Sequence, residues 1–292
     1  MKICRYGLAG LLIGILAVPS MVVAQEDTSQ AKPLERIVLK DGSEIVGHVE
    51  SETETMLVVR TLSDVVSSIP KAQITSRGPV SGYVEGTAYF RKDPNGTRLF
   101  FGPTARTLSA GQGYFSVYEI FFPAVGVGVT DWLDLSGGLS LFPGASEQLY
   151  YLSAKVAPIQ LRNLDVAAGV VFLNVTGNPE DFDGAGILHV IGTYGSEKAA
   201  LTAGVGWGFS GSDIENNPVF ILGAELRVSH SIKLISENWF PPSSDVQLLS
   251  IGLRFFGERL AADFGLWFPA GSEPSGFPLV PWIGFAYNFG AP

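Results

Sequence analysis

The side chains that could do chemistry in this 292-residue chain are ionisable groups at alternate positions within apolar, glycine-rich runs. The basic members are Arg98, Arg106, Lys155, Arg227, Lys233 and Arg254, and the acidic members are Glu119, Asp134, Asp165, Glu225, Glu237 and Asp263. Charges removed from water are costly unless they are paired or hydrated. The pattern therefore predicts either ion pairs that close an interior or charges that line a water-filled space.

Motifs of enzyme chemistry are missing from the sequence. It contains no GxSxG, no HExxH, no phosphate-binding glycine loop and no dinucleotide fingerprint. Its histidines are His48, His189 and His230, and no Ser–His–acid arrangement can be assigned from their spacing. We interpret His189 as an inward polar residue of a strand. The sequence predicts a non-enzymatic protein with no cofactor and no metal site.

The elements that position these charges show a two-residue period. In the segment Leu201–Ser210, one parity holds Leu201, Ala203, Val205, Trp207 and Phe209, and the other holds only glycine, serine and threonine. The segments 133–142, 260–268 and 283–289 alternate in a similar way. A soluble sheet would carry long polar side chains on its outer face. Glycine and small polar residues instead suit a narrow lumen, so we expect the apolar parity to face lipid.

The region 83–292 reads as a series of such strands joined alternately by tight polar turns and longer loops. The predicted strands are 97–106, 114–129, 133–142, 149–159, 164–175, 186–195, 199–210, 218–228, 232–240, 246–256, 259–268 and 279–289. This pattern predicts an antiparallel transmembrane β-barrel of about 12 strands, counted to within two. With an even number of strands, the first and the last residues of the barrel region lie at the same rim, the one with the tight turns.

Tryptophans cluster near the long-loop ends of the predicted strands. They are Trp207, Trp239, Trp267 and Trp282. Indole rings prefer the headgroup level of a membrane, so these four residues are predicted to form an aromatic girdle.

The N-terminus has the layout of an export signal. Lys2 and Arg5 precede an apolar run and small residues that end at Ala24, which predicts a signal peptide over residues 1–24. A short membrane anchor is the alternative. Cys4, the only cysteine, lies inside this segment, so the exported chain would have no disulfide. Residues 25–34 are predicted to be a polar linker. The net charge of −9 and the lack of a basic patch argue against binding to nucleic acid.

Residues 35–77 are predicted to form a small, separate β module. β-Rich runs flank the turn Lys40–Ser43, and further short runs follow. The segment resembles Sm-like or SH3-like modules in Ile37, Leu39 and the residues of that turn, followed by Ile45, Gly47 and Val49. The resemblance implies a five-stranded periplasmic module. Because the segment is exported and not basic, no RNA-binding role is carried over.

The barrel region resembles porin-like bacterial outer-membrane β-barrel proteins whose function is uncharacterised. The resemblance rests on "NGTRLFFGPTAR" at Asn95–Arg106 and on Gly113–Asp131. It implies a location in the outer membrane, contact with outer-membrane lipid and dependence on the barrel-insertion machinery. That machinery often reads a terminal aromatic residue, whereas here Phe289 is followed by three more residues.

The complete fold expectation is all-β: an SH3/Sm-like module followed by a transmembrane barrel. Two functions remain open. The first is a narrow pore for passive passage of ions or small polar solutes, lined by the charges named above. The alternative is a non-conducting membrane anchor whose periplasmic module binds a partner protein through its strand edges.

Overall fold

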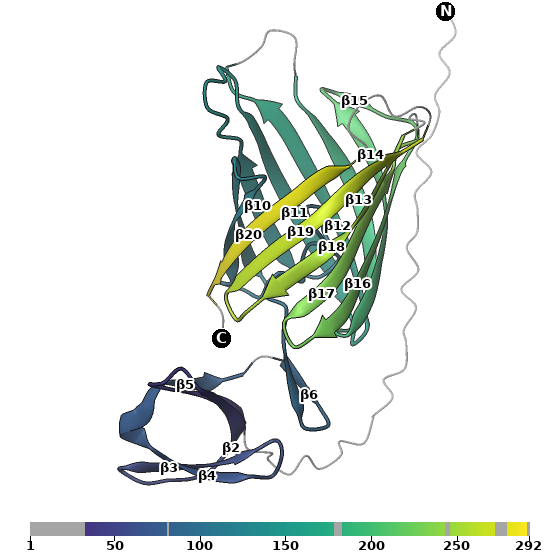
Figure 1. The fold of residues 1–292 in the computed structure, drawn as a ribbon. Helices are drawn as coiled ribbons and strands as arrows, with labels where there is room; N and C mark the ends of the chain where they lie inside the picture. The colour runs from purple at the N-terminus through teal and green to yellow at the C-terminus, as the bar shows by residue number, and fades with distance from the viewer. Residues whose placement is uncertain (1–32, 81, 178–182, 243–245, 272–278, 291–292) are drawn as a thin grey trace, which may run out of the picture.

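The computed structural model describes residues 33–80, 82–177, 183–242, 246–271 and 279–290, so the predicted signal peptide and most of the predicted linker lie outside the described residues. A small N-terminal sheet and a closed twelve-stranded antiparallel barrel make up most of the fold, and Figure 1 shows them as separate bodies. The all-β prediction is confirmed. Among the described residues, no helix has the length and apolar character needed to cross a membrane.

The N-terminal sheet has five strands in the order β4-β3-β2-β1-β5. The strands are β1 (Leu34–Leu39), β2 (Glu44–Glu52), β3 (Met56–Thr61), β4 (Val66–Pro70) and β5 (Ile74–Pro79), with a short 3-10 helix, η1 (Lys71–Gln73), before β5. At the β1–β2 turn, Gly42 has a φ of +84°, a conformation that glycine adopts without steric cost. Ile37, Leu57, Val59 and Ile69 form the buried core. The likeness of this sheet to Sm-like or SH3-like modules stays a prediction.

A hairpin of β6 (Gly82–Glu85) and β7 (Ala88–Arg91) connects this sheet to the barrel. Its Phe90 ring stacks on His230, in the turn after the barrel strand that ends at Ser229, with ring centroids 5.1 Å apart. In the N-terminal sheet, Arg36 pairs with Glu258 of another barrel turn. The module is therefore held against the tight-turn rim of the barrel (Figure 1).

Twelve strands close the barrel. They are β8 (Gly113–Tyr118), β9 (Phe122–Thr130), β10 (Leu133–Leu139), β11 (Leu149–Gln160), β12 (Leu164–Val175), β13 (Ala185–Gly195), β14 (Ala199–Ser210), β16 (Val219–Ser229), β17 (Ile232–Phe240), β18 (Gln247–Phe256), β19 (Leu260–Ala270) and β20 (Val280–Phe289). Each pairs with its neighbours in sequence, and β20 pairs with β8 to complete the ring. The two-residue strand β15 (Asp213–Ile214) adds to the end of β14.

The two faces of the barrel wall differ as the alternation predicts. On β14, Leu201 is 65% exposed, whereas its neighbours Ala200 and Thr202 are buried. Leu260 on β19 and Phe285 on β20 also lie on the exposed face. An outer surface of large apolar side chains is the surface of a barrel that sits in lipid.

Two of the predicted strands are wrong, and their errors cancel in the count. Residues 97–106 form no barrel strand. They belong to the segment 92–112, here called the plug, which lies inside the barrel and whose Leu99 and Phe100 are fully buried. Residues 114–129 form two strands, β8 and β9. The chain turns between them at Glu119 and Ile120, whose φ angles are +48° and +67°.

Inward glycines of the wall make room for the plug. A Cβ at Gly265 of β19 would lie 2.9 Å from the Phe100 ring, and a Cβ at Gly223 of β16 would overlap the Leu99 side chain. A larger residue at either position would push the plug away from the wall. The small residues that the sequence places at alternate, inward positions therefore leave space for the plug on this side of the lumen.

Candidate functional site

The plug is fastened to the wall of β16–β20 by buried ion pairs. Arg254 of β18 contacts Asp263 of β19 through Nε–Oδ1 at 2.6 Å, and Nη1 of Arg98 in the plug contacts Oδ2 of the same Asp263 at 2.6 Å. Arg254 also pairs with Asp93 of the plug at 3.2 Å. Asp263 and Arg254 are fully buried, so these charges are paired with each other and do not face water.

A second set of ion pairs lies toward the turn rim. Lys233 Nζ contacts Asp93 Oδ2 at 3.2 Å and Glu225 Oε1 at 3.1 Å. Arg106 of the plug contacts the other oxygen of Glu225 at 2.8 Å. Arg227 pairs with Glu197, of the β13–β14 turn, at 3.2 Å. The sequence interpretation missed Asp93 and Glu197, because both lie outside the predicted strands.

Glu237 of β17 binds the backbone of the plug. Its carboxylate accepts hydrogen bonds from the N–H groups of Phe100, Phe101 and Gly102 at 2.8, 3.0 and 2.9 Å. The Trp239 indole N–H donates to the same carboxylate at 2.8 Å. Hydrogen bonds to a charged acceptor are about twice as strong as those between neutral groups, so Glu237 fixes the tip of the plug.

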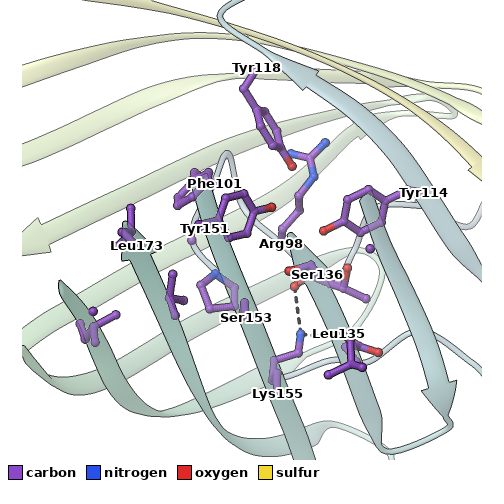
Figure 2. A pocket seen from close by; sticks show the side chains of 18 of the residues that line it. Arg98, Phe101, Tyr114, Tyr118, Leu135, Ser136, Tyr151, Ser153, Lys155 and Leu173 are labelled. Atoms are coloured by element: carbon purple, nitrogen blue, oxygen red, sulfur yellow. Dashed lines mark hydrogen bonds and ion pairs between the residues drawn. The ribbon is translucent and has the colours of Figure 1, made fainter. Parts of the chain in front are cut away.

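On the opposite side, between the plug and the wall of β8–β13, the lumen is open. A cavity of about 350 Å³ lies there (Figure 2). Its lining includes Arg98, Phe101, Tyr114, Tyr118, Asp134, Ser136, Tyr151, Ser153 and Lys155. Most of this lining is aromatic or aliphatic, with a few polar groups among it, as in small-molecule sites. The three tyrosines were not among the predicted site residues, although their inward parity is readable from the sequence.

The charges that face this cavity are held in place by the plug. Lys155 Nζ of β11 donates to the carbonyl oxygens of Thr97, Thr104 and Arg106 at 3.2, 3.0 and 2.5 Å. It also lies 3.4 Å from Oδ2 of Asp134 on β10, the contact drawn in Figure 2. Lys155 therefore ties the plug to the β8–β13 wall while leaving the cavity beside it open.

The cavity continues toward both rims. Toward the loops it shares Phe101, Tyr118, Leu173 and Trp239 with an apolar vestibule of about 590 Å³. Toward the turns it shares Thr97 and Leu108 with a cavity of about 130 Å³, whose lining also includes Glu197, Glu258 and Asn288. Three cavities that share lining residues thus lie beside the plug between the two rims.

The structure places the predicted charges in several settings. Arg98, Asp134 and Lys155 line the central cavity, and Arg106 lines the turn-end cavity. Arg254, Asp263, Lys233 and Glu225 are buried in ion pairs at the plug, so for these four the structure favours the predicted alternative of ion pairs that close an interior. Asp165 on β12 is partly exposed. Glu119 lies in the β8–β9 turn, where it lines the loop-end vestibule and accepts a hydrogen bond from the Ile283 N–H.

The girdle prediction is wrong for three of the four tryptophans. Trp239, Trp267 and Trp282 line the loop-end vestibule inside the barrel, and the last two pack against Phe100 of the plug with ring centroids 6.4 and 6.3 Å from it. Trp207 alone of the four lies on the lipid-facing parity, 37% exposed. Trp267 and Trp282 therefore support the plug instead of marking the membrane surface.

His189 lies buried on the inward face of β13, and its Nε2 has no hydrogen-bond partner among the described residues. No group of three or more His, Cys, Asp or Glu side chains placed to hold a metal ion occurs within the described ranges.

No protein-family model matches the chain, and no curated protein is detectably similar to it. Among solved structures, it is similar to a KdgM porin in complex with disordered oligogalacturonate, at 7% identity and a TM-score of 0.46, covering 61% of this chain and 98% of that one. It is also similar to the NanC porin, at 6% identity and a TM-score of 0.40, covering 61% and 97%. A third similar structure is Omp33 of Acinetobacter baumannii, at 9% identity and a TM-score of 0.37, covering 61% of this chain and 95% of that one. The barrel assignment rests on the strand pairing described above.

Proposed function

We propose that this protein is a bacterial outer-membrane barrel that passes ions or small polar solutes through the cavities beside its plug, with the central one against β8–β13. The observation that carries the proposal is the row of three adjoining cavities between the rims. Because these cavities lie beside the plug, the route is off the barrel axis. Its charged lining includes Arg98, Asp134 and Lys155 in the centre and Arg106 at the turn end.

The route is narrow and largely aromatic in its upper half. Phe101 at the plug tip packs edge-on against Tyr118 and Tyr151, with ring centroids 5.8 and 5.5 Å away. These rings form the boundary between the vestibule and the central cavity. We expect them to limit conductance, since a constriction of apolar rings resists wetting.

The test is single-channel recording of the refolded protein in a planar bilayer. A Ser153→Phe variant places a ring in the central cavity and should lower the conductance step. An Ala154→Phe variant changes the next residue of β11, which faces lipid, and should leave the step unchanged. Equal conductance of the parent and Ser153→Phe proteins would place the route elsewhere.

The second candidate function is the membrane anchor, and the packing of the plug on β16–β20 favours it. The outer edges of β4 and β5 in the module pair with no further strand within the described residues, so either edge could accept a partner strand. A correctly folded barrel that never gives current steps would support this role over the pore.

A further inference from the structure

Arg98 of the plug has buried hydrogen-bond donors without a partner among the described residues. The Arg98 guanidinium uses only Nη1, which donates to Asp263 and to the carbonyl oxygens of Leu99 and Phe100. Its Nε and Nη2 are buried and have no partner among the described residues. Leaving charged donors buried without acceptors is costly, so this arrangement requires an explanation.

Two polar groups of β8 and β20 are also buried and unpaired among the described residues. Trp282 of β20 has a buried indole N–H without a partner, and Ser116 of β8 has a buried hydroxyl without one, within the part of the chain that the structure describes. The Tyr118 ring lies 5.6 Å from the Trp282 ring and 5.3 Å from Arg98 Cζ. The guanidinium and the indole N–H are donors that lack an acceptor, and a carboxylate supplies acceptors only.

The charge balance at this position favours an anion. Arg98 has one acidic partner, Asp263, and shares it with Arg254, which also holds Asp93. The other cation of the cavity, Lys155, is already held by three carbonyl oxygens and lies next to Asp134. Of these two cations, Arg98 is therefore the one whose side chain still has hydrogen-bond donors without an acceptor.

The side chains around Arg98 indicate the chemistry of the uncharged part of the ligand. Figure 2 shows the Arg98 guanidinium beside Tyr118, with Phe101 and Tyr151 nearby. The cavity opens into the vestibule lined by Phe122, Trp239 and other aromatic residues. Rings of a ligand would stack in this channel, while its charged end reaches Arg98.

We propose that the central cavity binds small aromatic carboxylates, with the carboxylate on Arg98 and the ring among Phe101, Tyr118 and Tyr151. The Tyr118 ring covers one side of the guanidinium, so the carboxylate reaches Nε and Nη2 when that ring turns aside. The inference names a solute class for the proposed pore and rests on that function for the route of entry.

The test is calorimetric titration of the refolded full chain in detergent with naphthalene-2-carboxylate and, as a neutral analogue, naphthalene-2-carboxamide. We expect the carboxylate to bind on the order of tenfold more tightly, as one charge-assisted interaction allows. Arg98→Gln should abolish that preference. Arg162→Gln, in the exposed β11–β12 turn, is the control and should keep it.

Because Arg98→Gln also removes the pair with Asp263, Arg98→Lys serves as a second variant. Lysine keeps a charge near Asp263 but lacks the planar fork, so the preference should still fall. Equal binding of the two ligands, an unchanged preference in Arg98→Lys, or no binding of either ligand overturns the inference. Conductance measured on the same preparation separates the two claims: binding without current contradicts the pore, and current without binding contradicts the ligand site alone.

Discussion

The β16–β20 wall and the β8–β13 wall of this barrel have the same alternation of side chains but differ in how closely they pack against the plug. On β16–β20, Arg254, Gly223 and Trp267 are among the inward residues that pack against the plug. On β8–β13, Lys155 also holds the plug, but Ser136, Ser153 and tyrosines line a cavity that remains beside it. Parity decides which side chains face the lumen, and contacts with the plug decide where the lumen is filled.

The largest effect should come from breaking the fastening of the plug. Asp263→Asn removes the carboxylate shared by Arg98 and Arg254 and leaves buried guanidinium charge poorly compensated. We expect the free energy of unfolding to fall by about 3–5 kcal/mol, and the single-channel current to become noisier as the plug loosens. Urea unfolding in micelles measures the first effect.

The matched control lies on the other wall. Asp134→Asn removes a carboxylate beside Lys155, but Lys155 keeps its three carbonyl partners. The loss of stability should be smaller than for Asp263→Asn. If the two variants lose the same stability, the contrast between the two walls is wrong.

A steric change should give the next largest effect. Gly223→Ala places a methyl group against Leu99 of the plug, which is fully buried and has little space to move. We expect a loss of about 1–3 kcal/mol in urea unfolding, the usual cost of overpacking. Gly192→Ala on the lipid face of β13 meets no atom closer than 4.0 Å and is the control. An Ala variant at Gly223 that is as stable as the parent would mean that the plug does not pack there.

The smallest effect concerns exposed charges of the module. Hydrogen bonds from Lys71 and Arg77 lower the pKa of Glu52 from its usual 4.5 to about 2. Since the folded-state pKa is the lower one, these pairs stabilise the module above pH 4.5, and the contribution is lost as the pH falls toward 2. Glu52→Gln should slightly speed hydrogen exchange in β2 and β3 at pH 7. The difference from the parent should shrink as the pH falls toward 2, and a difference that stays the same between pH 7 and pH 2 would contradict the assignment.

Much of the fold was readable from sequence because strand alternation is a local property. Leu201–Ser210 and Leu260–Phe268 are strands with the predicted faces, and the turn at Lys40–Ser43 is present. The plug was not recognised, although two signals argue against a strand at 97–106. Pro94 and Gly96 precede the segment 97–106, and Gly102 and Pro103 lie within it. Proline and glycine rarely occupy central strands.

The filling of the lumen could not be predicted, because it depends on contacts between residues far apart in the chain. Arg98 and Asp263 are separated by 165 positions, and no local pattern indicates that they pair. The opposition of Arg254 and Asp263 across the β18–β19 hairpin is different, since the turn sets that register. The tryptophans at the loop rim were assigned to lipid although Trp267 and Trp282 lie on the inward parity, which the sequence does show.

The measurement that tests the central claim most directly compares one cysteine on each wall of a conducting barrel that carries Cys4→Ser. Ser153→Cys lies in the cavity, and Ser250→Cys lies under the plug, where Ser250 is buried against Glu237. A charged thiol reagent added to the bilayer should block current through Ser153→Cys and leave Ser250→Cys unchanged. Block at Ser250→Cys with none at Ser153→Cys would show that solutes pass on the other side of the plug.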